Sequence, residues 1–590
     1  MHKLENTQYD LFPTVEVNGF ADQCWRGWPA VCAEIRRLIV EKQSSSLVVA
    51  VETYTGLYDD ELLAELPSGL QPQTLLRTQQ ALKSPSEIES LIAPYLGGDD
   101  PLFGFYSPLT LNSFFDVTKQ GHLREQILNA TGVVIVYGVG ALLCCTPDIL
   151  IYADMPRWEG QLRQRRNQVS NLGVNNASLR ASLQYKRSFF IDWRVCDRLK
   201  KTSMSHWDYL LDTTVAGDPK LVTGTALRAA LDQTVQQPFR VKPFFDPAPW
   251  GGQWMKKQFH LDPKTTNFGW AFDCVPEENS LLLQFGEIRI EIPSQNLIYY
   301  RPRQLLGDTV YGLFGPEFPI RFDFLDTMEG GNLSLQVHPI VEYAQEKFGL
   351  HYTQEESYYL LAAGPAASVY LGLKQEIDID KMFTALQQAQ EGAEPFAAEQ
   401  YVNRWPAKKH DHFLIPAGTI HCSGAGAVVL EISATPYIFT FKLWDWGRLG
   451  LDGLPRPINI AHGRKVIQED RRTDWVKKNL INAIVPLASG QGWREERTGL
   501  HSLQFIETRR HWFTAPVLHQ TGGTVNVLNL VEGTAIIVES PQQKFKPFQV
   551  NYAETFIIPA QVDSYIIRPA EPTATEFATI KAFVRTSATN

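Results

Sequence analysis

The sequence lacks the features that mark secreted, membrane-spanning and nucleic-acid-binding proteins. Its 590 residues include seven cysteines, an odd number with no CxxC spacing, which argues against a disulfide framework. The longest apolar run, Val133 to Cys145, has 13 residues with glycines inside it and is too short to span a bilayer. The N-terminus has no apolar signal core. We therefore expect reduced thiols, no structural disulfides and a cytoplasmic location.

Neither sign of charge dominates. Lys and Arg number 55 against 64 Asp and Glu, and the resulting net charge of −9 is spread along the chain. Because there is no basic field to hold nucleic acid or an anionic membrane surface, we expect a small molecule as the partner. The oligomeric state stays open.

Hydrophobic residues make up 44% of the chain, which is ample for buried cores, and a length of 590 residues predicts about three to four domains. Residues 1–237 alternate amphipathic and apolar stretches, which is typical of an α/β domain with a parallel sheet. The helix is expected at Trp28–Ser44, and the strands at Ser46–Glu52, Gly132–Val139 and Ile149–Asp154.

Short strands dominate after the turn-rich segment PFFDPAPWGG, residues 243–252. They are separated by Gly, Pro, Asn and Asp, as in Leu281–Ile292 and Ala425–Ile432, and a few helices interrupt them, as at Asp380–Gln390. This pattern of short strands and turns predicts a β-barrel or sandwich over residues 238–489 and a second, smaller barrel over residues 490–590.

Metal-binding chemistry is indicated by two motifs that lie far apart in the sequence. Pro416-Ala417-Gly418-Thr419-Ile420-His421 is a PxGxxH turn directly before a strand, which resembles the metal-binding turn of cupin barrels. In Gln336-Val337-His338, strand alternation sends the two polar side chains to one face. Glu356 opens a third strand and can add a carboxylate. Such a set suits Zn²⁺ with one position left open.

The ordered motifs resemble the type I phosphomannose isomerases. These motifs are Trp250-Gly251-Gly252, LSLQVHP at residues 333–339, Glu356, PAGTIH at 416–421, Val429-Leu430-Glu431 and TFKLWDWGR at 440–448. The resemblance runs from about Pro243 to the C-terminus. It implies two cupin domains, the second without metal, and the interconversion of mannose 6-phosphate and fructose 6-phosphate. It also implies zinc held by His338, Glu356 and His421, with Gln336 as a fourth ligand.

The same resemblance suggests the catalytic and substrate-binding residues. The family's catalytic Arg aligns with Lys442, which keeps the charge and loses the bidentate fork, so either Lys442 or Arg448 supplies the cation. Glu431 is the candidate to orient substrate or relay a proton. A second departure is Asp323, where many members have a Lys, and it weakens the expectation of a phosphate at that strand. The candidate substrate contacts are Ser334, Gln336 and Thr419.

Other polar residues near these motifs have simpler interpretations. Glu355 is expected to face solvent, opposite to Glu356, and His410 and His412 to lie in a solvated loop. In the second barrel, His519 is expected to be structural.

The N-terminal domain resembles the uridine kinase group of P-loop kinases in the order of its strands, its helix from Asp60 and its arginines. The phosphate loop is lost. When the segment is aligned with the phosphate-binding motif GxxxxGK[ST], the motif's last Gly is replaced by Leu57, its Lys by Tyr58 and its Ser or Thr by Asp59. We therefore expect no phosphoryl transfer. In the kinases, arginines such as Arg163, Arg165 and Arg166 belong to a lid over the active site. Taken by themselves, these three arginines are better explained as a solvent-exposed helix face.

The sequence therefore predicts a degenerate kinase-like α/β domain, a zinc cupin with isomerase activity and a metal-free second cupin. The alternative is a regulatory cupin protein that binds a sugar phosphate with little or no turnover, because of the departures at Lys442 and Asp323.

Overall fold

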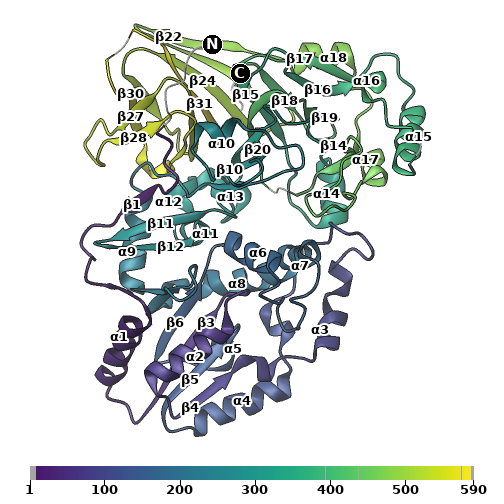
Figure 1. Ribbon diagram of the computed structural model, residues 1–590. Coiled ribbons are helices and arrows are strands. Elements are labelled where there is room, and N and C mark those ends of the chain that lie inside the picture. Colours follow the sequence, from purple (N-terminus) through teal and green to yellow (C-terminus); the bar gives the residue numbers. More distant parts are fainter. Residues whose placement is uncertain (1–7, 393, 436–437, 573, 587–590) are drawn as a thin grey trace. The chain divides into compact units, whose positions relative to one another are not determined.

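The computed structural model describes residues 8–392, 394–435, 438–572 and 574–586, and it shows a multidomain chain rich in β-sheet (Figure 1). The chain divides into two compact units. One comprises Thr14–Thr234 with Glu277–Arg301, and the other comprises the chain up to Pro13, Val235–Pro276 and the chain from Pro302. None of the described helices has the length and apolar character needed to cross a bilayer. The three-domain boundaries stay a prediction.

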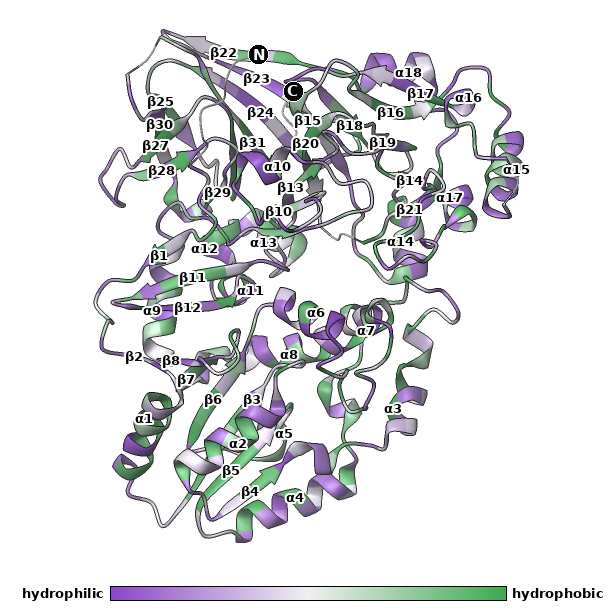
Figure 2. Ribbon diagram, in the orientation of Figure 1, coloured by the Kyte–Doolittle hydropathy of each residue, from purple (hydrophilic) through white to green (hydrophobic). Residues whose placement is uncertain are grey.

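The first unit is built on a seven-stranded sheet in the order β2-β8-β7-β6-β3-β5-β4. Strands β4, β5, β3, β6 and β7 run parallel, as the alternating pattern predicts, and β8 runs antiparallel to both of its neighbours, β7 and β2. The central strands are apolar on both faces because helices cover both sides of a parallel sheet, and Figure 2 shows β5 and β6 largely in green. The strands are β2 (Cys24–Arg26), β3 (Ser46–Thr53), β4 (Thr74–Arg77), β5 (Gly132–Gly138), β6 (Ile149–Asp154), β7 (Tyr209–Asp212) and β8 (Lys220–Thr223).

The helices of this unit connect successive strands. They are α1 (Trp28–Glu41), α2 (Asp59–Leu70), α3 (Pro85–Ile92), α4 (Val117–Asn129), α5 (Ala141–Cys144), α6 (Arg157–Arg165), α7 (Ala181–Arg187), α8 (Trp193–Ser203), α9 (Gly224–Thr234) and α11 (Gln295–Tyr300). Helix α1 ends three residues before the expected Ser44.

The segment Leu281–Ile292 belongs to this first unit. The sequence pattern instead places it among the short strands of the barrel predicted over residues 238–489. It forms the hairpin of β11 (Ser280–Phe285) and β12 (Ile288–Pro293), and β11 pairs in parallel with β1 (Thr14–Glu16). The strand β11 is buried along nearly its whole length, so it needs cover on both faces. Strand pairing across more than 260 residues leaves no local signal in the sequence.

The second unit contains two pairs of antiparallel sheets, and the first pair positions the candidate site. One sheet has the order β18-β15-β20-β13-β10-β9 and the other β17-β16-β19-β14-β21. The strands are β9 (Phe244–Asp246), β10 (Trp270–Cys274), β13 (Ile320–Asp326), β14 (Leu335–Val337), β15 (Glu356–Ala363), β16 (Ser368–Leu373), β17 (Val402–Pro406), β18 (His412–Ile415), β19 (His421–Ser423), β20 (Ala427–Ala434) and β21 (Phe441–Trp444). We call this pair the first barrel.

The second barrel has the sheets β22-β23-β24-β31-β26-β29 and β25-β30-β27-β28 around an apolar core that includes Phe513, Leu528 and Phe556. Its strands are β22 (Val485–Gly490), β23 (Trp493–Gly499), β24 (Ile506–Phe513), β25 (Val517–Gln520), β26 (Asn526–Glu532), β27 (Ala535–Glu539), β28 (Phe548–Asn551), β29 (Thr555–Ile558), β30 (Ser564–Pro569) and β31 (Phe577–Val584). Helices of the unit are α10 (Trp254–Gln258), α12 (Pro302–Leu306), α13 (Asp308–Phe314), α14 (Val341–Phe348), α15 (Ile379–Gln390), α16 (Ala398–Tyr401), α17 (Ile460–Val466) and α18 (Thr473–Asn479).

Candidate metal centre and active site

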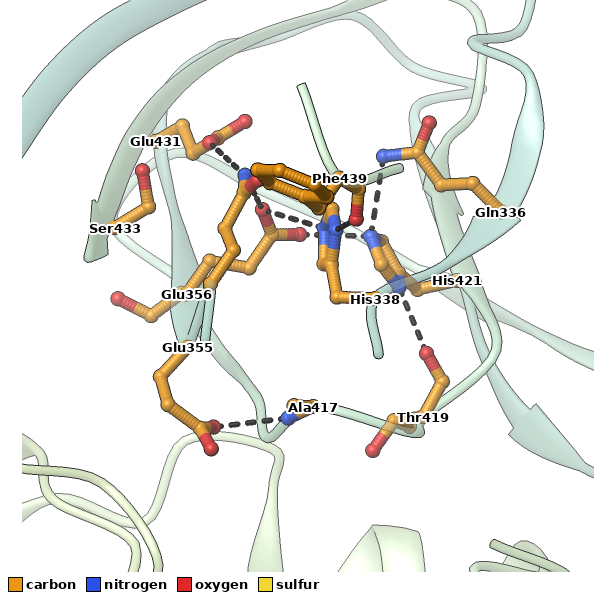
Figure 3. A network of polar contacts seen from close by, with 12 residues as sticks. Gln336, His338, Glu355, Glu356, Ala417, Thr419, His421, Glu431, Ser433 and Phe439 are labelled. Carbon is orange, nitrogen blue, oxygen red and sulfur yellow. Dashed lines mark hydrogen bonds and ion pairs between the residues drawn. The ribbon is translucent and has the colours of Figure 1, made fainter. Parts of the chain in front are cut away.

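Three residues that the sequence predicts as metal ligands come together inside the first barrel (Figure 3). His338 follows β14, Glu356 begins β15 and His421 begins β19, and each is at most 1% exposed. The Glu356 carboxylate lies 3.1 Å from His338 Nε2 and 2.7 Å from His421 Nε2. Their ligand atoms all lie within 4.8 Å of one another, which is close enough for one ion to bind all three.

The local structure fixes the orientation of both imidazoles. His421 Nδ1 lies 2.8 Å from the Thr419 carbonyl oxygen, and His338 Nδ1 lies 3.1 Å from that of Phe439. Each ring can therefore donate through Nδ1 and present Nε2 to Glu356, as metal-binding histidines do. The turn requires Gly418, whose φ is 84° and where a Cβ would lie 2.7 Å from the Val466 carbonyl oxygen.

Electrostatics favours an ionised carboxylate at the centre of the triad. Burial alone would raise the pKa of Glu356, but the neighbouring His338 and His421 hold it well below its usual range. No described residue gives His338 Nε2 or Glu356 Oε1 a hydrogen bond of good geometry, although both atoms are buried. A divalent cation would satisfy both atoms.

Gln336 lies beside the triad. It pairs with His421 across β14 and β19, and its Nε2 lies 3.3 Å from His421 Nε2. Because the two ends of an amide are assigned rather than observed, a half-turn would bring Oε1 to the same position. The amide of Gln336 therefore lies next to the three candidate ligands.

A buried network of carboxylates adjoins the triad and contains two residues that sequence reasoning missed. Arg321 donates to Glu431 Oε1 at 2.8 Å and lies 3.2 Å from Asp323 Oδ1. Gln354 Nε2 bridges Glu356 and Glu431 at 3.2 and 3.3 Å. Alternation along β13 puts Arg321 on the same face as Asp323, and this signal could have found it.

The surroundings of Glu431 favour its protonated form. Burial, followed by the charges of Asp323 and Glu356, raises the pKa of Glu431 well above its usual range, although Arg321 opposes the shift. Burial likewise raises the pKa of Asp323 to about 6, and Arg321 opposes this shift too. Arg321 therefore partly balances the two acids beside it.

A second polar cluster is centred on Asp445, just after β21. Ser334 Oγ donates to Asp445 Oδ1 at 2.8 Å, and Arg448 donates to the same oxygen at 2.5 Å. Arg456, which the sequence did not single out, donates to Ser334 Oγ at 3.0 Å and to Asp445 Oδ2 at 2.6 Å. Arg448 also donates to the Asn332 carbonyl oxygen, so it is held firmly in this cluster.

Lys442 lies on β21, opposite Gln336 in the sheet. Burial and the charge of Arg456 lower the pKa of Lys442 to about 8, although Asp445 opposes the shift. Thr419, by contrast, is 1% exposed and donates its hydroxyl to the Pro416 carbonyl oxygen at 2.7 Å. Its carbonyl orients His421.

Two expectations about nearby side chains are wrong. Glu355 does not face solvent: it accepts from the Ala417 amide at 2.8 Å, and burial raises its pKa to about 7. It precedes the first residue of β15, so strand alternation does not govern it. His412 is fully buried in β18 and so is not in a solvated loop, whereas His410 lies in the preceding turn, partly exposed and 2.9 Å from Glu532.

His519 in the second barrel is buried and stacks on Tyr565 with ring centroids 5.2 Å apart. The ring of His511 lies 4.5 Å away. The expectation that this barrel holds no metal stays a prediction.

The loop before α2 in the first unit leads into an acidic helix start. Helix α2 begins with three carboxylates of its own, and Asp59 accepts from the Tyr137 hydroxyl. Arg163 is buried, not solvated: it pairs with Glu159 at 2.9 Å and lies over the Tyr58 ring. This arginine is committed to internal contacts.

The fold and site define a double β-barrel protein with a buried His-Glu-His cluster. Residues 27–236 match a family described as a domain of unknown function, DUF8485. The chain is 27% identical over 222 residues to the mannose-6-phosphate isomerase of Streptococcus mutans, covering 37% of this chain and 64% of that enzyme. The chain thus spans less than two thirds of that relative.

Two Bacillus subtilis proteins are similar. ManA, a mannose-6-phosphate isomerase, is 25% identical over 233 residues, 39% of this chain and 68% of ManA. YvyI, to which the same activity is attributed, is 25% identical over 349 residues, 56% of this chain and 96% of YvyI. The crystal structure of the mannose 6-phosphate isomerase from Bacillus subtilis aligns with a TM-score of 0.48 at 18% identity, covering 59% of this chain and 99% of that one.

Proposed function

We propose that the first barrel is a metal-dependent aldose-ketose isomerase that interconverts mannose 6-phosphate and fructose 6-phosphate, with Zn²⁺ as the metal. The observation that supports this most is the convergence of His338, Glu356 and His421 in a chain whose curated relatives are mannose-6-phosphate isomerases. The alternative of a regulatory protein without turnover has no comparable support, because the ligand set is complete.

The donor set fits zinc. Two imidazole nitrogens, one carboxylate and a nearby amide suit a borderline divalent ion and leave room for substrate. When bound, the ion acts as a Lewis acid that stabilises negative charge on the sugar oxygens at C1 and C2.

The reaction moves one proton from C2 to C1 and another from O2 to O1, through a cis-enediol. Glu431, whose pKa is raised by burial, can relay a proton between the two oxygens. Arg321 and Gln354 hold the Glu431 carboxyl in place. Lys442 supplies a positive charge near the developing enediolate.

We assign the phosphate end of the substrate to the cluster around Ser334. Arg456 contacts both Ser334 and Asp445 and supplies the cation of this cluster. A guanidinium beside a hydroxyl is well suited to bind phosphate oxygens. Gln336 lies beside His421 and opposite Lys442 in the sheet, and Thr419 positions His421 through its carbonyl oxygen. Arg448 holds Asp445 and acts as a positioning residue.

For the first unit we propose a kinase-like α/β fold without phosphoryl transfer. The parallel strand order β4-β5-β3-β6-β7 supports such a fold, and the carboxylates at the start of α2 argue against phosphate binding. The free cysteines, six of seven buried, are compatible with the proposed cytoplasmic location.

The experiment is a coupled assay for fructose 6-phosphate formed from mannose 6-phosphate. The wild type should turn over, and His421→Ala should lose at least 10³-fold in rate together with its metal. His351→Ala, which changes an exposed histidine of the same barrel, is the matched control and should behave as the wild type. An inactive wild type with zinc bound would contradict the proposal.

A further inference from the structure

The first unit contains a cavity of about 390 Å³ that the proposed isomerase does not use. It lies at the carboxyl ends of β3, β4 and β5, three parallel strands labelled in Figure 1. In open α/β sheets, ligands bind outside these strand ends. The volume is near the lower end of the ~300 to 1,000 Å³ typical of ligand pockets, so it fits a small ligand.

The charges around the cavity disfavour an anion. All lining residues are described, and among them Arg77 is the single cation, against Asp59 and Asp60. The N-terminus of α2, which could attract a phosphate, carries these two carboxylates in its first turn. Arg163 is not available either, because it bonds the Thr213 carbonyl oxygen and Glu159.

The aromatic side chains of the cavity offer little surface on which a nucleobase could stack. Tyr54 is 4% exposed and Tyr137 is 3% exposed. The Arg163 guanidinium lies 3.9 Å from the centre of the half-buried Tyr58 ring and covers one of its faces. We therefore expect recognition in this cavity to come mainly from hydrogen bonds.

The polar lining suits hydroxyl groups. Carboxylate oxygens accept hydrogen bonds, amides both donate and accept, and a sugar hydroxyl does both. Vicinal hydroxyls can thus bridge carboxylates and amides around the cavity. The lining residues able to do this are Asp59, Asp60, Gln79, Gln168, Ser170 and Asn175.

We propose that this cavity binds an uncharged monosaccharide, with Asp60 accepting from two of its hydroxyls. The ligand is unphosphorylated, unlike the substrate proposed for the first barrel. The chain would then bind a free sugar at one site and a sugar phosphate at another.

The test is isothermal titration of D-mannose and D-fructose into the full-length His421→Ala protein, whose isomerase site lacks its metal. We expect saturable binding of at least one sugar with one site per chain. Asp60→Asn, which keeps the shape and weakens the acceptor, should bind at least tenfold more weakly, as expected for a lost bond to a charged group. Glu65→Gln, on the same helix and outside the lining, is the control.

Three results would overturn the proposal. They are no binding of any hexose, equal affinity in Asp60→Asn with an unchanged melting temperature, or tighter binding of mannose 6-phosphate or uridine than of the free sugars. A Gln168→Leu variant provides a second lining change if Asp60→Asn fails to fold. Failure of the isomerase proposal would show in the coupled assay of the wild type and would leave this binding unaffected.

Discussion

Replacing Lys442 tests whether this lysine is the catalytic cation. It lies opposite Gln336 on the strand next to the triad, and burial together with the charge of Arg456 lowers its pKa. If its ammonium stabilises the enediolate, Lys442→Ala should lower kcat by roughly 10² to 10³, or about 3 to 4 kcal/mol of barrier, and change KM less.

The pH dependence gives an independent readout. With a pKa of about 8, Lys442 is protonated at pH 7 and loses its charge above pH 8, so the wild-type rate should fall about fivefold between pH 8 and 9. Lys442→Arg should keep a high rate across this range, since a guanidinium stays charged. The assay is kcat and KM for mannose 6-phosphate from pH 6 to 9.5 at fixed zinc.

Near-wild-type kcat in Lys442→Ala would refute this reasoning. Arg448→Ala is the informative comparison, because Arg448 is tied to Asp445 and the Asn332 carbonyl oxygen. We expect it to lower stability without removing the alkaline fall in rate. If Arg448→Ala lowers kcat by a similar factor at every pH and Lys442→Ala does not lower it, Arg448 is the catalytic cation.

Three further predictions concern the rest of the chain. Arg240→Met should destabilise the second unit by about 3 to 5 kcal/mol in thermal unfolding, because it removes the ion-pair partner of the buried Glu554 carboxylate. In the wild type that carboxylate lies 2.8 Å from the Arg240 guanidinium. A decrease of less than about 1 kcal/mol in the free energy of unfolding would contradict this prediction. Burial raises the pKa of Glu278 to about 8, so folding takes up a proton there, and its contribution to stability should fall by about 1.4 kcal/mol per unit as pH rises from 4.5 to 8. Glu278→Gln should flatten that part of the stability profile, and an unchanged profile would exclude this carboxyl as its cause. Magnesium-ATP and a nucleoside should give no phosphorylated product with the full-length protein, whereas ordinary kinase turnover would show that Tyr58 and Asp59 do not block phosphate binding.

Local patterns predict the elements and the triad well. The strand predicted at Ile149–Asp154 has the same bounds in the structure. Alternation in Gln336-Val337-His338 and the PxGxxH turn placed both histidines correctly, because backbone geometry over a few residues determines where these side chains point.

Contacts set by the pairing of distant strands could not be predicted in this way. Glu431 meets Arg321 because β13 and β20 align Asp323 with Glu431 and Arg321 with Ser433, a register without any local signal. Arg456 reaches Ser334 across more than 120 residues. His412 is buried because Gly499 of the second barrel packs against it, which composition cannot show.

The central claim is tested most directly by titrating zinc into chelator-treated protein while the isomerase rate on mannose 6-phosphate is measured. The rate should be near zero without metal and should rise linearly until one zinc is bound per chain, with no further rise beyond it. A rate that survives full removal of metal, or a chain that binds one zinc at His338, Glu356 and His421 and forms no fructose 6-phosphate, would contradict the assignment.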